Sequence, residues 1–123
     1  MKRDMNIVRE IVRQIADSKE RLFEGEFVFE DMDVSKEELD YHLIIMKEAG
    51  IIEGNHKVIH GEIMFYSYYL GWLGNDFYET FKDDNVWEGA KSLVKSKGLE
   101  IANIPFDILM ELGKKMILDM FKL

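Results

Sequence analysis

The sequence predicts a single α+β domain over residues 1–123. This length suits one domain of the commonest size, and 47% hydrophobic with 33% charged residues is typical of a globular chain. Apolar residues recur at helical spacing in several segments, whereas two apolar runs have the composition of paired strands. The chain has no cysteine, so disulfides, thiolate metal sites and cysteine nucleophiles are excluded.

The first predicted element is a helix over residues 4–18. One face of this helix collects the apolar side chains of Met5, Val8, Ile11, Val12 and Ile15. The following segment, RLFEGEFVFEDMDV, alternates around Phe27 and Phe29, which indicates a short strand.

A second helix is predicted over SKEELDYHLIIMKEAG. Ser35 can cap its start, and Glu38 three residues later completes a capping box. Val34 and Leu39 have the spacing of a hydrophobic staple, and Gly50 supplies the left-handed residue that ends a helix.

A β-hairpin is predicted next, from apolar runs near 51–53 and 63–70. The residues between these runs carry turn chemistry, at Gly54, Asn55 and Gly61.

Three helices follow in the prediction. One covers about 72–82, the next covers about 86–97 with Asp84 or Asn85 as its cap, and the last begins near Pro105. The aromatic side chains expected in the core of this part are Trp72, Phe77, Phe81 and Trp87. Close packing of the backbone against Trp72 is the expected reason for Gly71 and Gly74.

The order helix, strand, helix, hairpin over residues 1–70 is that of a winged helix, and residues 71–123 form a helical extension. A helix-turn-helix has two helices after the first strand. Only about five residues separate the predicted strand from the Ser35 cap, so we expect the additional helix to be a single turn at most.

Four pieces span nearly the whole chain, from Met1 to Lys115: MKRDM followed by an Ile-Val-Arg helix, YHLIIMKEAGIIEG, LGWLGNDFYETFKDDNVW and IPFDILMELGKK. Together they resemble an uncharacterised family of unknown function that is common in phages and prophages of Gram-positive bacteria. The resemblance implies a winged-helix core and a mobile-element origin, and it supplies no activity. The family usually has Thr, Glu and His where this chain has Gly71, Leu73 and Asn75, so no role of those side chains carries over.

Charge argues against DNA binding by the second helix. The net charge is −8, and residues 22–75, with three basic and eleven acidic side chains, also sum to −8. The helix face that would enter a groove offers no Arg, Lys, Asn or Gln to a base edge. That face consists of Glu37, Asp40, Tyr41, Ile44 and Glu48.

We therefore expect a non-enzymatic accessory protein that binds another protein through this acidic face. Tyr41 and Ile44 would be its apolar anchors, unless another segment such as the last helix covers them. An acidic face can compete for basic surfaces, so a DNA-processing protein of host or phage is a reasonable partner class.

The alternative is a transcriptional regulator that binds DNA as a dimer. Its candidate phosphate contacts are Lys2, Arg9, Arg13 and Lys57. A third interpretation is an enzyme subunit or small-ligand binder that uses the aromatic-rich region 64–81.

The last helix is apolar around more than half of its circumference. It is either wedged between elements of one subunit or packs on a second copy. In a homodimer the candidate contacts are Ile117, Leu118 and Phe121.

No catalytic, cofactor-binding or metal-binding constellation is predicted. We interpret His56 and His60 as loop histidines of the hairpin, and His42 as a packed histidine with one hydrogen-bond partner. The charged start lacks the apolar core of a signal peptide, and the apolar C-terminal stretch carries Asp107, Glu111, Lys114, Lys115 and Asp119. We expect a cytoplasmic protein with no membrane segment and no cofactor.

Overall fold

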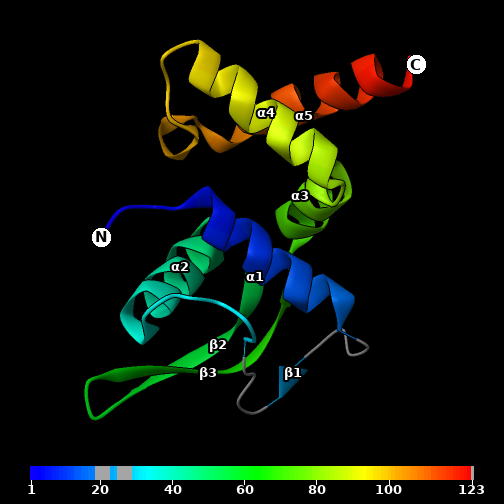
Figure 1. Cartoon of the computed structure of the whole chain (residues 1–123). Helices are drawn as coiled ribbons and strands as arrows, with labels where there is room; N and C mark the ends of the chain where they lie inside the picture. The colour runs from blue at the N-terminus through cyan, green and yellow to red at the C-terminus, as the bar shows by residue number, and fades with distance from the viewer. Residues whose placement is uncertain (19–22, 25–28, 123) are drawn as a thin grey trace.

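A computed structural model describes residues 1–18, 23–24 and 29–122, and the fold of this part is α+β, as predicted (Figure 1). Its helices are α1 (Met5–Asp17), α2 (Lys36–Glu48), α3 (Trp72–Phe81), α4 (Asp84–Ser96) and α5 (Phe106–Phe121). Its strands are β1 (Phe23–Glu24), β2 (Ile52–Ile59) and β3 (Glu62–Leu70). A short 3-10 helix at Ile101–Asn103, which the sequence did not indicate, leads into α5.

The three strands form one antiparallel sheet with β3 in the centre, in the order β1-β3-β2. The hairpin turn is tighter than predicted, because Gly54 and Asn55 belong to β2 and not to the turn. His60 and Gly61, with φ of 52° and 78°, make a two-residue turn that matches the twist of the flanking strands. The strands of the hairpin are therefore longer than their apolar runs.

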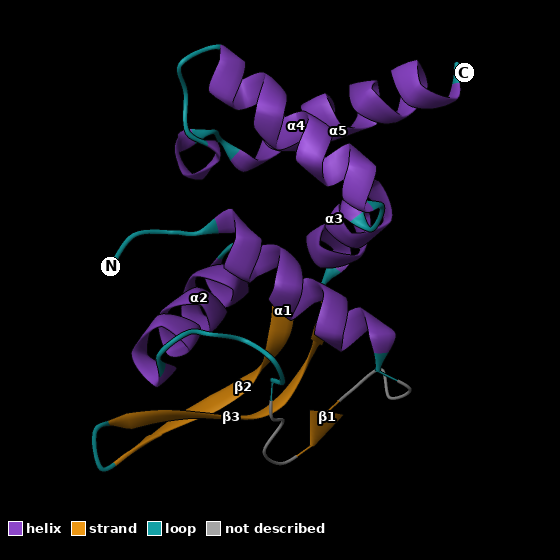
Figure 2. Ribbon diagram, viewed as in Figure 1, coloured by secondary structure: helices purple, strands orange, loops and turns teal. Residues whose placement is uncertain are grey.

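Helix α1 lies at the centre of the molecule, and its apolar stripe is buried as predicted. It packs on α2 and on β3 on one side and on α3 on the other (Figure 2). Asp4 caps its start by accepting the backbone N–H of Asn6 at 2.9 Å. The buried side chains form one cluster that draws on both 1–70 and 71–123.

The predicted ends of α2 are confirmed. Ser35 Oγ accepts the N–H of Glu38 at 3.1 Å. Gly50 has φ of 77°, and its N–H donates to the carbonyl of Lys47 at 3.1 Å. The N–H of Ile51 donates to the carbonyl of Met46 at 2.9 Å, which completes a Schellman motif.

The chain before α2 differs from the prediction. Strand β1 lies at Phe23–Glu24, Phe27 falls outside the described residues, and Phe29 is in an extended loop. The Phe29 ring stacks on Tyr68 at 6.1 Å between centroids, so Phe29 packs against the central strand. Within residues 29–35 no helical turn forms, which agrees with the expectation of a single turn at most, and Asp31 has a left-handed φ of 55°.

The hairpin and α3 meet the end of α2 at a close backbone contact, which we call the glycine joint (Gly50, Ile51, Gly71 and Gly74). The N–H of Gly71 donates to the carbonyl of Ile51 at 2.9 Å. A Cβ on Gly71 would lie 2.5 Å from the Gly50 oxygen, and a Cβ on Gly74 would lie 2.0 Å from the Ile51 oxygen. These glycines are needed for the approach of two backbones, and not for packing against Trp72.

Trp72 is the one aromatic side chain predicted for the core that the structure places in solvent. It is 87% exposed, whereas Phe77, Phe81 and Trp87 are buried as predicted. Gly74, Phe77 and Phe81 set the buried side of α3, and Trp72 projects from the opposite side at the first helical position.

The last two helices complete the fold. The cap of α4 is Asp83, one residue before the predicted candidates, and its Oδ1 accepts the N–H of Asn85 at 2.8 Å. Helix α5 follows Pro105 as predicted. Gly113 lets α5 approach α3, since a Cβ there would lie 2.4 Å from the Phe81 ring.

Gly74→Ala should lower the free energy of unfolding by about 3 kcal/mol, because its Cβ would meet a backbone oxygen that cannot move alone. Gly89→Ala is the matched control in another helix. Its Cβ would meet only the mobile methyl end of Met116, so a change within about 1 kcal/mol is expected. Urea unfolding followed by circular dichroism measures both, and equal losses would contradict the role given to the glycine joint.

Candidate functional site

A hollow of about 500 Å³ lies between the start of α2 and the hairpin turn. We call it the acidic hollow. It is lined by Lys36, Glu37, Asp40, Tyr41, Gly61, Glu62 and Ile63. The Ser35 cap starts α2 beside the hollow, and the tight turn at Gly61 brings the hairpin end to its other side.

The hollow carries a net negative charge. Its only cation among the lining residues is Lys36, whose Nζ lies 2.7 Å from Asp40 Oδ2. The hydrogen bond to Asp40 raises the pKa of Lys36, and the charges of Asp40 and Glu62 act in the same direction. Three carboxylates against one ammonium leave two negative charges, and Glu37 and Glu62 hold theirs in exposed positions.

A second cavity, of about 380 Å³, lies between α1, α2 and the start of α5. We call it the apolar groove. It is lined by Arg3, Met5, Val8, Tyr41, Ile45, Met46, Ala49, Ile51 and Phe106. The Arg3 guanidinium donates to the carbonyls of Ala102 and Ile104, which ties the start of the chain to the approach to α5. Tyr41 lines both cavities.

The structure brings together three of the five residues expected to contact a protein. Glu37, Asp40 and Tyr41 line the acidic hollow. Ile44 is half-buried and Glu48 exposed further along α2, and neither lines either cavity. Phe106, at the start of α5, lines the apolar groove together with Tyr41, which is half-buried.

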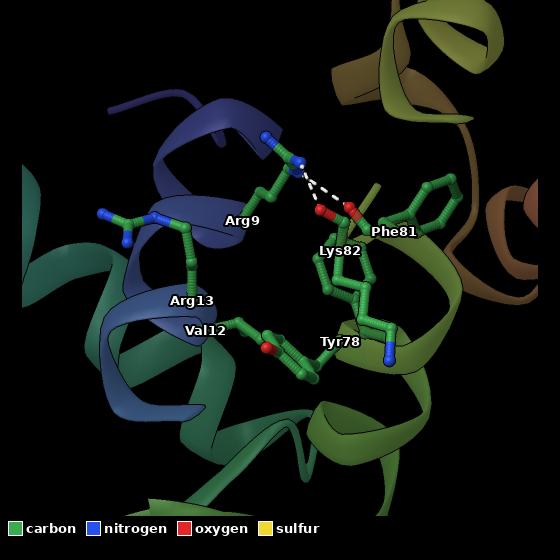
Figure 3. A pocket seen from close by; sticks show the side chains of 7 residues that line it. Arg9, Val12, Arg13, Tyr78, Phe81 and Lys82 are labelled. Atoms are coloured by element: carbon green, nitrogen blue, oxygen red, sulfur yellow. Dashed lines mark hydrogen bonds between the residues drawn. The ribbon is translucent and has the colours of Figure 1, made fainter. Parts of the chain in front are cut away.

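The candidate phosphate contacts on the N-terminal segment are engaged within the chain. Lys2 lies 2.7 Å from Glu100, and this contact lowers the pKa of Glu100. Arg9 reaches Asp84 at 2.7 Å. Its Nε donates to the Phe81 carbonyl at 2.9 Å (Figure 3).

Arg13 bonds to Glu10 and Asp17 on its own helix. The hydrogen bond from Arg13 lowers the pKa of Glu10. Lys57, the fourth candidate, is exposed on β2. Carboxylates therefore already offset the charges of Lys2, Arg9 and Arg13.

At its α3 end, the aromatic region considered for a small ligand leaves little space. The cavity between α1 and α3, lined in part by Phe77, Tyr78 and Phe81, has a volume of about 10 Å³ (Figure 3). That is room for one water molecule, on the order of 10–15 Å³. This cavity is a by-product of the packing of α3 on α1.

His42 is 1% exposed and has two hydrogen-bond partners, not the single partner predicted. Its Nε2 accepts the backbone N–H of Asp4 at 2.9 Å, and its Nδ1 lies 2.7 Å from the carbonyl of Glu38. Because a backbone N–H can only donate, the proton of the neutral ring is on Nδ1. His42 thereby fixes α2 to the start of α1 and orients the helix that carries Tyr41.

His60 is a loop histidine in the hairpin turn, as predicted, whereas His56 lies within strand β2 and not in a loop. His56 packs on the Phe65 ring at 5.3 Å and lies 3.2 Å from Lys47 Nζ, while His60 occupies the turn. In residues 1–18, 23–24 and 29–122 no three His, Asp or Glu side chains gather in a way that could hold a metal ion. No helix of the same ranges is long and apolar enough to cross a membrane.

Sequence reasoning missed the apolar groove and the exposure of Trp72. The groove joins Arg3 and Phe106, which are far apart in the chain, so no local pattern indicates it. Trp72 did carry a signal, because a helical wheel places it away from Phe77 and Phe81.

The structure thus defines a small α+β protein built on a three-stranded antiparallel sheet, with an acidic hollow beside an apolar groove. The family model described as "Hypothetical protein (DUF2513)" matches residues 2–100, so the chain belongs to this family. An "Uncharacterized protein" of Haemophilus influenzae is 27% identical over 106 residues, which cover 83% of this chain and 86% of the relative. No solved structure matched the chain. This membership confirms the resemblance to an uncharacterised family, whereas a phage or prophage origin stays a prediction.

His42→Ala should lower the free energy of unfolding by about 2–4 kcal/mol, since it removes two buried hydrogen bonds and leaves a cavity. His60→Asn is the control, because His60 is exposed and Asn tolerates its left-handed backbone. Thermal unfolding of both variants checks this, and a loss as large in His60→Asn as in His42→Ala would contradict it.

Proposed function

We propose that this chain is a non-catalytic, cytoplasmic protein that binds another protein through the acidic hollow and the apolar groove. The observation that carries the proposal is the position of Tyr41, which lines both cavities. Protein interfaces favour an aromatic anchor at the centre with polar and charged groups around it. Tyr41, with exposed Glu37 and Glu62 on one side and apolar lining on the other, has that arrangement.

The negative charge of the acidic hollow favours a partner with a positively charged surface. Two uncompensated carboxylates favour a segment with Lys or Arg, and complementary charge raises the rate of encounter. The apolar groove would take a large aliphatic or aromatic side chain from the same segment. A basic, nucleic-acid-binding surface of a DNA-processing protein offers both features. This chain would occupy that surface in place of nucleic acid.

A winged-helix-like core is part of the proposal. The order α1, β1, α2, β2, β3 supports it, and the β2–β3 hairpin has the place of the wing. In this arrangement α2 corresponds to the recognition helix, and its acidic face is presented to a protein instead of to a DNA groove. A mobile-element origin, which the family resemblance implies, fits an accessory protein of this kind.

The test is capture of a partner by the full chain. Immobilised wild-type chain is incubated with nuclease-treated lysate of the organism that encodes it, and bound proteins are identified by mass spectrometry. Glu37→Lys combined with Glu62→Lys reverses the charge of the hollow at two exposed positions, and we expect it to reduce capture at least roughly ten-fold. Tyr41→Ala should reduce it similarly.

Glu88→Lys on α4 is the control, because it changes an exposed acid away from both cavities. It should capture the partner as the wild type does. Equal capture by the wild type and the hollow variant would reject the acidic hollow as the contact.

The second candidate is the dimeric DNA-binding regulator, which the winged-helix order favours. It would have to release Lys2, Arg9 and Arg13 from their carboxylates before they could contact phosphates. Fluorescence anisotropy with duplex DNA at several salt concentrations tests it. A regulator should lose affinity steeply as salt rises, whereas we expect no measurable binding near physiological salt.

A further inference from the structure

Helix α5 has an outward side that no other element of the described residues covers. Its buried residues, Leu109, Met110 and Gly113, face α3 and α4. On the opposite side lies a row that we call the outer face of α5, formed by Ile108, Glu111, Lys115, Leu118 and Lys122. The far end of the helix extends away from the β2–β3 hairpin (Figure 1).

Two apolar side chains stand out on this face. Ile108 is 53% exposed and Leu118 is 49% exposed, and about 15 Å of helix separates them. Ile117, which the sequence suggested as a dimer contact, packs instead against the core of its own chain. Phe121 is 58% exposed at the end of the helix, on its flank.

The two charged residues of this face between Ile108 and Leu118 make no ion pair with the rest of the described chain. Among residues 1–18, 23–24 and 29–122, neither Glu111 nor Lys115 has an ion-pair partner, although they are four residues apart on one helix. Lys114, by contrast, pairs with Asp76 of α3 at 3.4 Å. An acid in the first half of the face and a base in the second half are therefore available to another molecule.

These positions are symmetric about residue 113. Ile108 and Leu118 lie five residues before and after it, and Glu111 and Lys115 lie two before and two after. A two-fold axis at this point would place a second α5 antiparallel to the first. Ile108 would then meet Leu118 of the partner subunit, and Glu111 would meet Lys115 of the partner subunit, each contact occurring twice.

We propose that the outer face of α5 binds the same face of a second copy of this chain. A two-fold interface must be complementary to itself, and the pairs Ile108–Leu118 and Glu111–Lys115 meet this condition. Antiparallel helices also bring the positive end of one helix dipole near the negative end of the other. The interface is small, so a dimer that dissociates on dilution is expected.

The outer face of α5 shares no residue with the lining of the acidic hollow or of the apolar groove. A dimer through α5 would carry two copies of the protein-binding site. Two sites on one particle would strengthen binding to a partner that is itself repeated or dimeric.

Sedimentation equilibrium of the full chain over a range of concentrations tests the proposal. The wild type should dimerise, whereas Glu111→Lys and Lys115→Glu should each place like charges together and raise the dissociation constant about ten-fold. An equimolar mixture of the two variants should recover the association, because position 111 of each chain then faces the opposite charge at position 115 of the other. Leu118→Asp should raise the dissociation constant by roughly a hundred-fold or more.

Lys95→Glu on α4 is the matched control for Lys115→Glu, since both reverse one exposed lysine. It should dimerise as the wild type does. A monomeric wild type would overturn the proposal, and so would a dimer that both reversals leave intact. Failure of the mixed variants to associate more tightly than either alone would reject the antiparallel pairing.

Discussion

The backbone of Gly71 and Gly74 lies against that of Gly50 and Ile51, with no room for a side chain between them. This contact joins three features of the chain: the end of α2, the base of the hairpin and the start of α3. It fixes where α3 begins, and therefore where α4 and α5 lie relative to α1. Ile51 also lines the apolar groove, so the same contact sets one wall of that groove.

The rest of the site depends on how α2 is held. Ser35 starts the helix, Gly50 ends it, and His42 bonds its buried side to the start of α1. With these three points fixed, Tyr41 lies between the hollow and the groove. The acidic hollow and the apolar groove both lie next to the Tyr41 side chain. The outer face of α5 is a separate surface. The two proposed contacts, one with a partner and one with a second copy, do not compete.

Local chemistry predicted much of this fold. The caps at Ser35 and Gly50, the start of α5 after Pro105 and the burial of Phe77 follow from neighbouring residues alone. The α+β class followed from the same patterns, because helical and strand periods differ. Most of the errors depended on a contact distant in sequence. Phe29 packs on Tyr68 instead of extending a strand, and the tight turn at His60 and Gly61 is reached by strands longer than their apolar runs.

The candidate site was predicted in part: Glu37, Asp40 and Tyr41 share one helix face, whereas the apolar groove joins residues about a hundred positions apart.

Photo-crosslinking from position 41 inside living cells shows directly what this face of the protein contacts. A photo-reactive phenylalanine analogue replaces Tyr41 in the full chain, and a second chain carries the analogue at Lys95 on α4. We expect a specific cross-link from position 41 to a protein, through a segment rich in Lys or Arg, and none to that protein from position 95. Equal cross-linking of that protein from both positions, or cross-links to DNA alone, would contradict the claim that this face binds a protein.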